Sequence, residues 1–325
     1  MRAAVFLDPW SPLSIQEIDK PQIESDELLV RVSHCGICGT DIHASREGPF
    51  MAPPNTVFGH EFSGEIVDVG DALSEDDWRV GERVTSLPFI KEQTIGLGAA
   101  TGAYAEYIKV DPASVVQIPA ELDDLNGALI EPLAIGLHSV KMAQGVNEKR
   151  VLIIGAGPIG LACALWCRFF GAREVVFSEM SPTRIKIANT MGFDQVIDPT
   201  GDVLGQFAAS AGGEPEIQFD CVGAPGILQQ CIERAPKRGR IMGIGLCDHP
   251  DTIVPLVAFS KELTIQWAVA YDKEDWDFTI QMMVNGRIDG TAMITNVVSL
   301  DELPDAFEAL RSPSDQCKVI IDLSR

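Results

Sequence analysis

The chain has 325 residues, 46% of them hydrophobic, and a formal net charge of −22 from 47 acidic and 25 basic residues. This length allows about two domains with sizeable cores, and the negative charge argues against nucleic acid and anionic membranes as partners. No run reaches the roughly 18 consecutive apolar residues that a membrane span needs, and no signal peptide is visible. We therefore expect a cytoplasmic protein without a membrane segment.

Residues 1 to about 120 contain short runs that alternate polar and apolar residues, such as ELLVRVS (27–33) and FSGEIVDVG (62–70). Glycine, proline and acidic turns separate these runs, which is typical of an antiparallel β domain. From about residue 149 the pattern changes to apolar strands that alternate with helices. This alternation predicts a doubly wound parallel sheet.

After residue 274 the pattern changes again, to an amphipathic helix, a strand near 293–298, a second helix and a last strand. We expect this segment to pack back on the first domain. The predicted fold is α/β, with a β domain formed by residues 1–140 and 275–325. Residues 141–274 form the predicted dinucleotide-binding domain.

The segment GAGPIG (155–160) matches the pattern G-x-G-x-x-G in the required context, after an apolar strand and before a helix. The first glycine permits a tight turn, the second lets the backbone approach a pyrophosphate, and the third allows close packing of helix on strand. The first amides of the helix then face the phosphate oxygens. The predicted cofactor-binding residues of this turn are Gly155, Gly157, Pro158, Ile159 and Gly160.

Glu179 ends the next strand, nineteen residues after the last glycine of this motif. A carboxylate there can bind the adenosine ribose hydroxyls and repel a 2′-phosphate, which favours NAD over NADP. Arg184 follows five residues later and would either pair with such a phosphate or lie on the helix surface. Val222 and Ile244 end later strands at the carboxyl edge of the sheet, where we expect them to line the nicotinamide pocket.

The segment HCGICGTDIH (34–43) offers two cysteines and two histidines. Half of a zinc ribbon would need a second C-x-x-C, which the chain lacks, and a thioredoxin-like pair would need a βαβ context. A third alternative takes one cysteine as a metal ligand and the other ligands from distant segments. His60 and Glu61, adjacent polar residues between apolar ones, are candidates for this role.

Glu131 is a carboxylate within the apolar segment GALIEPLAIG (127–136). An ionised glutamate is almost never buried unless it is paired or bound to a metal. Glu131 is therefore either a surface residue where a loop meets a helix or a group that faces a metal.

Four segments in this order, GICGTDIH (36–43), GHEFSGEIVDVG (59–70), IEPL (130–133) and GAGPIG, span nearly the whole chain. Together they resemble the zinc-dependent medium-chain alcohol dehydrogenases, most of all the sorbitol and polyol dehydrogenase branch. The resemblance implies a GroES-like, partly open antiparallel β-barrel as catalytic domain beside a Rossmann domain. It also implies hydride transfer between NAD and a secondary alcohol, polyol or sugar-type substrate, with the ketone as substrate of the reverse reaction.

The resemblance implies the metal site as well. Cys38 and His60 take the positions of two catalytic zinc ligands, and Glu61 follows as a carboxylate on or next to the metal. Glu131 stands where alcohol dehydrogenases carry a second cysteine and polyol dehydrogenases carry glutamate. We therefore expect Glu131 to face zinc, directly or through a water.

The family relationship further implies a proton relay through Thr40, the cofactor ribose and His43. Thr40 could instead cap the helix that begins nearby, since threonine is a good N-cap, and Asp41 is interpreted as supporting local structure. Residues 81–107 contain no cysteine, where the family often carries a structural-zinc lobe, so we expect one catalytic zinc per chain and no structural zinc. We also expect a homo-oligomer, a dimer or a tetramer.

Two other functions use the same fold. One is a zinc-free NAD(P)H-dependent reductase, and the other is a non-enzymatic binding protein. The presence of cofactor, metal and relay positions in one chain favours the dehydrogenase.

Overall fold

The structure, a computed structural model, describes residues 1–325 except 75, 92, 99–100 and 313–314. Its contacts separate two compact units. Unit 1 comprises Met1–Glu131, Trp276–Val284 and Ile294–Arg325, and unit 2 comprises Pro132–Asp275 and Asn285–Met293. Two of the divisions fall inside helices, at 131/132 and 275/276. The domain limits at 140/141 and 274/275 stay a prediction.

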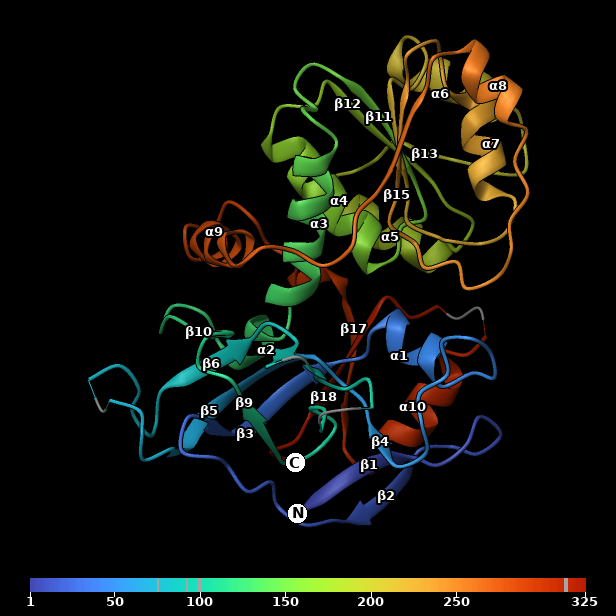
Figure 1. Ribbon diagram of the computed structural model, residues 1–325. Helices are drawn as coiled ribbons and strands as arrows, with labels where there is room; N and C mark the ends of the chain where they lie inside the picture. Colours follow the sequence, from blue (N-terminus) through green and yellow to red (C-terminus); the bar gives the residue numbers. More distant parts are fainter. Residues whose placement is uncertain (75, 92, 99–100, 313–314) are drawn as a thin grey trace. The chain divides into compact units, whose positions relative to one another are not determined.

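Unit 1 consists mainly of antiparallel strands (Figure 1). The strands are β1 (Arg2–Phe6), β2 (Ser14–Glu17), β3 (Leu28–Gly36), β4 (Thr56–Val57), β5 (Glu61–Val69), β6 (Arg83–Ser86), β7 (Phe89–Ile90), β8 (Gln93–Thr94), β9 (Tyr107–Val110), β10 (Val115–Gln117), β17 (Ile294–Ser299) and β18 (Lys318–Asp322). The helices are α1 (Gly39–Ala44), α2 (Asp124–Gly127), α10 (Leu303–Ala309) and most of α9 (Lys273–Val284). The predicted antiparallel β domain is confirmed.

The larger sheet of unit 1 has the order β10-β6-β5-β3-β18-β17, and β9 also pairs with β3. Strand β18 runs antiparallel to β3, with Ile321 opposite Cys35. The last strand of the chain is therefore a neighbour of the strand that leads to the predicted metal ligands. In the core of unit 1 the rings of Phe6 and Phe58 are tilted, with centroids 5.3 Å apart, and those of Phe58 and Phe307 are stacked at 6.0 Å.

Unit 2 contains a parallel sheet with the order β13-β12-β11-β14-β15-β16. Its strands are β11 (Arg150–Ile154), β12 (Glu174–Ser178), β13 (Val196–Ile197), β14 (Ile217–Asp220), β15 (Arg240–Gly243) and β16 (Thr264–Trp267). Its helices are α3 (Ile130–Met142, from 132), α4 (Pro158–Phe169), α5 (Pro182–Thr190), α6 (Val203–Ala211), α7 (Ile227–Arg234), α8 (Pro255–Ser260) and the 3-10 helix η1 (Thr291–Met293). If the six strands are numbered by their order in the chain, their order across the sheet is 3-2-1-4-5-6, which is the dinucleotide-binding arrangement. The predicted doubly wound sheet is confirmed.

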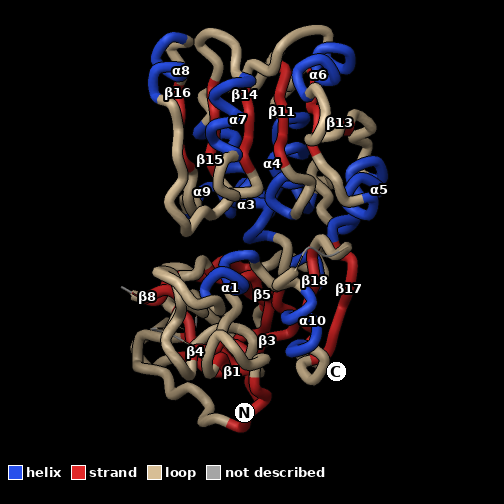
Figure 2. The backbone as a smooth tube through the Cα atoms, turned by 90° about the vertical axis from the view of Figure 1, so that its right-hand side faces the viewer, coloured by secondary structure: helices blue, strands red, loops and turns tan. Residues whose placement is uncertain are grey.

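Local signals explain why these elements form. Residues 151–154 of β11 are all buried and apolar, as expected for a parallel strand covered on both faces. Helices α3 and α4 lie on one side of the sheet and α7 and α8 on the other (Figures 1 and 2). Ser181 caps α5 by accepting a hydrogen bond from the Arg184 amide, and Pro182 opens that helix. Among the described residues, no helix combines the length and hydropathy that crossing a bilayer requires.

Candidate functional site

Cys38 lies where β3 has ended and α1 begins, and it is the N-cap residue of α1. Its Sγ accepts a hydrogen bond from the Thr40 amide at 3.4 Å, and its own amide donates to Asp41 Oδ2 at 3.2 Å. The thiol is thereby held in one position by the start of the helix. Because Cys38 and not Thr40 caps α1, the alternative role of Thr40 as the helix cap is wrong.

His60 is buried and stands between Cys38 and Asp41. Its Nδ1 lies 3.4 Å from Asp41 Oδ1, and its ring is also within hydrogen-bonding reach of the Cys38 thiol. Burial lowers the pKa of His60, but the charge of Asp41 and then that of Cys38 outweigh burial, so the pKa is raised. Burial, followed by the charge of Glu61, raises the pKa of Cys38. A metal that binds these two side chains must displace protons from them.

Glu61 begins β5 and forms a buried ion pair with Lys318 of β18. The Lys318 ammonium donates to Glu61 Oε1 at 2.8 Å, to Glu61 Oε2 at 2.6 Å and to the carbonyl oxygen of Ile37 at 3.0 Å. Opposite Glu61 in the sheet stands Gly36, where a Cβ atom would lie 2.0 Å from Glu61 Oε2. The glycine thus provides the space that the carboxylate occupies.

Glu131 lies in the first turn of α3 and is only 5% exposed. The surface alternative for this residue is therefore wrong. Burial lowers the pKa of Lys318, but the charges of Glu61, Cys38 and also Glu131 outweigh burial, so that the pKa is raised. Glu61 is bound directly to this buried ammonium group, and the charges of Cys38 and Glu131 also act on it.

The donor set of Cys38, His60, Glu61 and Glu131 offers sulfur, nitrogen and oxygen atoms of the kinds that bind zinc. Two buried polar atoms, His60 Nδ1 and Asp41 Oδ1, face each other at 3.4 Å and make no hydrogen bond among the described residues. A metal-bound histidine ordinarily turns its second nitrogen to a carboxylate in this way. The types of donor atom therefore fit a zinc ion. In this structure no three of the four side chains bring their donor atoms within 4.8 Å of one another.

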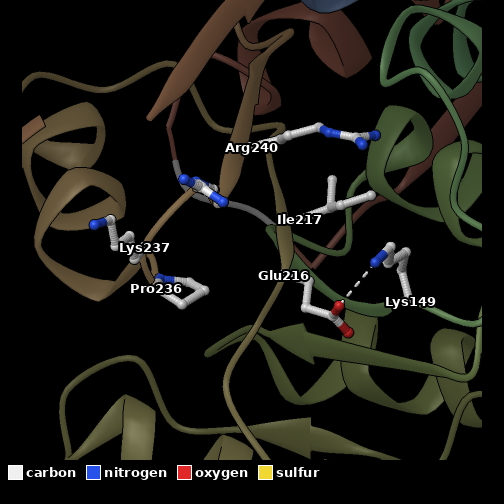
Figure 3. A pocket seen from close by; sticks show the side chains of 8 residues that line it. Lys149, Glu216, Ile217, Pro236, Lys237 and Arg240 are labelled. Carbon is white, nitrogen blue, oxygen red and sulfur yellow. Dashed lines mark hydrogen bonds and ion pairs between the residues drawn. The ribbon is translucent and has the colours of Figure 1, made fainter. Parts of the chain in front are cut away.

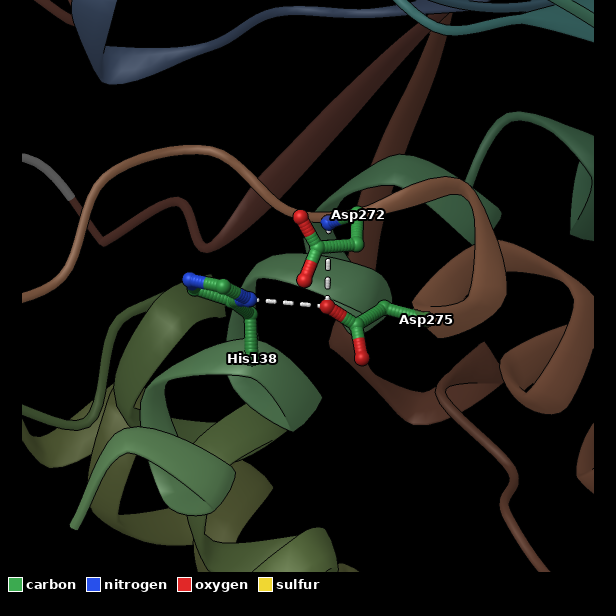
Figure 4. A group of neighbouring side chains, drawn as sticks. All are labelled: His138, Asp272 and Asp275. Carbon is green, nitrogen blue, oxygen red and sulfur yellow. Dashed lines mark hydrogen bonds and ion pairs between the residues drawn. The ribbon is translucent and has the colours of Figure 1, made fainter.

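One group of the described residues does meet that distance criterion, namely His138, Asp272 and Asp275 (Figure 4). The fully buried Asp275 carboxylate contacts His138 Nδ1 at 2.7 Å, Lys141 Nζ at 2.5 Å and the Asp272 amide at 3.1 Å. Lys141 supplies the positive charge that a metal would otherwise bring. We interpret the group as an ion-pair network that joins residue 275 to α3.

Thr40 and His43, the predicted relay residues, are three positions apart in α1 and both are partly buried. Residues at this spacing lie on the same side of a helix. The two side chains therefore share one side of α1, the helix that Cys38 caps.

The glycine-rich turn of unit 2 connects β11 to α4. Gly155 has φ +91°, a conformation that favours glycine, and a Cβ atom at Gly160 would lie 2.0 Å from the carbonyl oxygen of Gly155. At Gly157, the N-cap of α4, a Cβ atom would meet nothing within 4 Å. Gly155 and Gly160 are thus needed for the shape of the turn. At Gly157 the space in front of Pro158 and Ile159 is open.

Glu179 follows β12 and accepts three backbone hydrogen bonds. Its Oε2 accepts from the Ala156 amide at 2.8 Å, and its Oε1 accepts from the amides of Met180 and Ser181 at 2.7 and 2.8 Å. The carboxylate is therefore fixed beside the glycine-rich turn. The Arg184 amide donates to the Ser181 hydroxyl, so that Arg184 stands in the first turn of α5.

Val222 and Ile244 follow the adjacent strands β14 and β15 at the carboxyl edge of the sheet. The Val222 amide donates to Asp220 Oδ1 and the Ile244 amide donates to the Asp220 carbonyl oxygen. Val222 is 46% exposed. This edge is where doubly wound folds bind ligands.

The opposite edge of the same sheet carries a cavity of about 220 Å³ (Figure 3). Its basic side chains do not converge: Lys149 pairs with Glu216 at 3.0 Å, and Lys237 pairs with Glu262 at 3.3 Å. Arg240 donates to carbonyl oxygens just beyond the end of α3. We interpret these cations as bracing the loops and not as a ligand site.

The prediction that Asp41 supports local structure is confirmed by its hydrogen bond to the Cys38 amide. Sequence reasoning missed the contact of Asp41 with His60 and the role of Lys318. The position of Asp41 three residues after Cys38 fits a capping box, but its contact with His60 depends on the tertiary fold. A lone lysine at the start of the apolar strand KVIID was a signal for Lys318, since a buried lysine needs a partner.

Comparison with known proteins places this arrangement in a family. The model of the alcohol dehydrogenase GroES-like domain matches residues 24–120, and that of the zinc-binding dehydrogenases matches residues 158–285. The (R,R)-butanediol dehydrogenase of Bacillus subtilis is 29% identical, over 95% of this chain and 96% of the relative. An L-threonine 3-dehydrogenase of Rhizobium johnstonii is 28% identical, over 99% of this chain and 98% of the relative.

Solved structures agree with these matches. An alcohol dehydrogenase of E. coli in complex with NADH superposes with a TM-score of 0.90 at 27% identity, over 99% of both chains. A zinc-binding dehydrogenase of Sinorhizobium meliloti bound to NADP gives 0.88 at 28% identity, over 99% of this chain and 98% of that chain. The GroES-like and Rossmann folds expected from the sequence are confirmed. The chain therefore belongs to the zinc-dependent medium-chain alcohol dehydrogenase family.

Proposed function

We propose that the protein is an NAD-dependent zinc dehydrogenase that oxidises a secondary alcohol or polyol and reduces the corresponding ketone in reverse. One observation carries the proposal: Asp41 accepts the Cys38 amide at 3.2 Å and lies 3.4 Å from His60 Nδ1, which holds the two proposed ligands together. The carboxylates Glu61 and Glu131 and the cation Lys318 are buried in the same unit. When zinc is bound there, it supplies the Lewis acidity that favours loss of the alcohol proton. NAD supplies the hydride acceptor.

In this proposal Cys38 and His60 bind zinc and a carboxylate completes the site. Both oxygens of Glu61 are bound by Lys318, and we therefore assign this position to Glu131. Glu61 becomes a ligand only if it leaves that ion pair. Thr40 and His43 of the same helix would hold and move the substrate proton, as the resemblance to the family implies.

We propose NAD and not NADP as the cofactor. The Glu179 carboxylate is held beside the glycine-rich turn by three amides, where it would repel a 2′-phosphate. The glycine-rich turn would bind the pyrophosphate, and Val222 and Ile244 would line the nicotinamide pocket.

The proposed substrate class follows from the chemistry of the relatives. Butanediol and threonine, the compounds in the names of two relatives, are both secondary alcohols with a polar group on the neighbouring carbon. We propose a substrate with the same pattern, acted on in the cytoplasm.

We propose a homo-oligomer that associates through the free edge of the unit 2 sheet. Strand β16 ends the strand order, and exposed apolar side chains gather on it and on the preceding helix α8. They are Leu256, Phe259 and Trp267, which are 71%, 81% and 62% exposed.

The first experiment is elemental analysis of protein purified without added metal, followed by NAD reduction with butane-2,3-diol, L-threonine and sorbitol. The proposal expects about one zinc per chain, loss of activity with a chelator and recovery with zinc. Cys38→Ser should lose the metal, whereas Cys247→Ser, which changes an exposed cysteine, should keep it.

A zinc-free protein that reduces carbonyl compounds would support the reductase alternative. A protein without turnover on any substrate would support the binding protein.

A further inference from the structure

Asp41 links the two proposed ligands Cys38 and His60. Its Oδ2 accepts the Cys38 amide at 3.2 Å and its Oδ1 lies 3.4 Å from His60 Nδ1. A third group also binds this carboxylate, since the Tyr104 hydroxyl donates to Asp41 Oδ2 at 2.6 Å. Asp41 is fully buried, so its orientation depends on these few contacts.

Tyr104 is itself held rigidly. It is fully buried, its amide donates to the Phe58 carbonyl oxygen at 2.9 Å, and its ring meets Phe307 edge-on at 81°. The ring also fills the space beside Gly59, where a Cβ atom would lie 2.4 Å from Tyr104 Cδ1. Because Gly59 immediately precedes His60, the segment around Tyr104 is packed directly on the backbone that carries the histidine.

The hydroxyl needs an explanation beyond packing. Phenylalanine would fill the same space without the cost of burying a polar group. Burial, followed by the charge of Asp41, raises the pKa of Tyr104, so the phenol remains protonated and donates its hydrogen bond. That bond, with the one from the Cys38 amide, occupies Oδ2 and leaves Oδ1 facing the imidazole.

We propose that Tyr104 is a positioning residue of the metal site, whose hydroxyl fixes Asp41 so that His60 directs Nδ1 to the carboxylate and Nε2 to the metal. The inference rests on the proposed function, because it requires a metal on Cys38 and His60. Carboxylates that bind a ligating histidine are worth about 10–100-fold in metal affinity. Tyr104 stands one step farther out, so we expect about a 10-fold effect.

The test compares Tyr104→Phe with Tyr107→Phe, which alters a partly buried tyrosine whose ring faces Lys20. Zn²⁺ affinity is measured by competition with a chromophoric chelator, and coordination is followed through the visible absorption of the Co²⁺-loaded protein. We expect Tyr104→Phe to bind Zn²⁺ about 10-fold more weakly, within the range for such shells, and to shift the Co²⁺ bands. Tyr107→Phe should match the unmodified protein.

A double-variant cycle separates positioning from general stability. If Tyr104 acts through Asp41, Tyr104→Phe should change metal affinity little in an Asp41→Asn background. Equal losses in both backgrounds, or a Tyr104→Phe protein with unaltered affinity and Co²⁺ spectrum, would overturn the inference while the proposed function stands. Failure of the unmodified protein to bind zinc would overturn both.

A second measurement applies if Tyr104→Phe does not fold. The chain has three tyrosines, so 3-fluorotyrosine labelling gives three ¹⁹F resonances, and Tyr107→Phe and Tyr271→Phe identify that of Tyr104 by elimination. The Tyr104 resonance should shift as one equivalent of Zn²⁺ is added. A resonance that does not move would contradict the positioning role.

Discussion

Lys318 decides the charge of the proposed metal site. Once Cys38 is deprotonated, the thiolate, Glu61 and Glu131 bring three negative charges, and Lys318 neutralises one of them. Zn²⁺ would offset the two that remain, and the buried Asp41 carboxylate beside His60 adds a further negative charge. The buried ion pair of Lys318 with Glu61 is costly to break, because the partner left behind stays charged and out of water.

Replacing Lys318 by methionine tests this balance. Lys318→Met should lower the free energy of unfolding by about 3–5 kcal/mol, because Glu61 would be left buried and unpaired. The double change Lys318→Met with Glu61→Gln should recover much of this loss. Urea denaturation of the metal-free proteins measures both, with Lys237→Met, from an exposed ion pair, as the control without appreciable effect. A single variant as stable as the control would contradict the buried pair.

Glu179 governs the choice of cofactor at the same scale. Glu179→Gln keeps the shape of the side chain but removes the charge that opposes a 2′-phosphate. We expect the ratio of kcat/KM for NAD to kcat/KM for NADP to fall about 10-fold or more, since a charge contact of about 1.4 kcal/mol is worth that factor. Glu174→Gln, at the start of the same strand, should leave the ratio unchanged. An unchanged ratio in Glu179→Gln would argue for another determinant, with Arg184 the first to examine.

At the scale of elements, two helix starts carry the chemistry. Helix α1 begins at a cysteine that caps it with its sulfur, so the proposed ligand and the helix position each other. Helix α4 begins at Gly157, where a Cβ atom would meet nothing within 4 Å. Pro158 fits the first turn because proline needs no amide partner there. The first amides of α4 would face the pyrophosphate, whereas at α1 the Thr40 amide is bound by the Cys38 sulfur.

Substitutions of two glycines at the start of α4 distinguish an effect on folding from an effect on cofactor binding. Gly160→Ala should destabilise the protein and abolish NAD binding, because its Cβ would collide with the Gly155 carbonyl oxygen. Gly157→Ala should fold normally, since nothing lies within 4 Å of its Cβ position, yet weaken NAD binding where the pyrophosphate approaches. Thermal unfolding and NADH fluorescence titration test the contrast. Normal cofactor affinity in Gly157→Ala would place the pyrophosphate elsewhere.

At the scale of the whole molecule, stability depends on carboxylates that are held ionised. Buried or paired acids in both units, among them Glu27, Glu216, Asp275 and Asp322, have a lowered pKa despite opposing burial. Their stabilisation is fully present above the ordinary carboxyl pKa and is lost as the pH falls through the lowered values. The chain should therefore be least stable in acid.

Asp275 provides a specific test of this acid sensitivity. Burial raises its pKa, but bonds from Lys141, the Asp272 amide and His138 outweigh burial and lower the pKa below the ordinary 3.8. Asp275→Asn should therefore cost about 2 kcal/mol at pH 7, and this difference from the unmodified protein should shrink as the pH falls below about 3.8. Asp277→Asn, an exposed acid of the same helix, serves as control in urea titrations. A difference that persists at the lowest pH would contradict the ion-pair interpretation.

The sequence by itself determined the family, the β domain followed by a doubly wound sheet, and the glycine-rich turn. These features depend on local periodicity and on residues that are close in the chain, so that one short segment predicts a strand, the turn after it and the following helix. It also identified Glu131 as an anomaly, because a carboxylate among apolar residues needs a partner.

Only the tertiary structure decided which groups surround the proposed ligands. Lys318 reaches Glu61 across 257 residues of chain because β18 pairs with β3, and Tyr104 reaches Asp41 across 63. Such partners are set by sheet register and core packing between distant segments, for which one sequence contains no periodic signal. The cap of α1 was likewise decided in three dimensions, where the backbone placed Cys38 at the N-cap, so that its sulfur accepts the Thr40 amide.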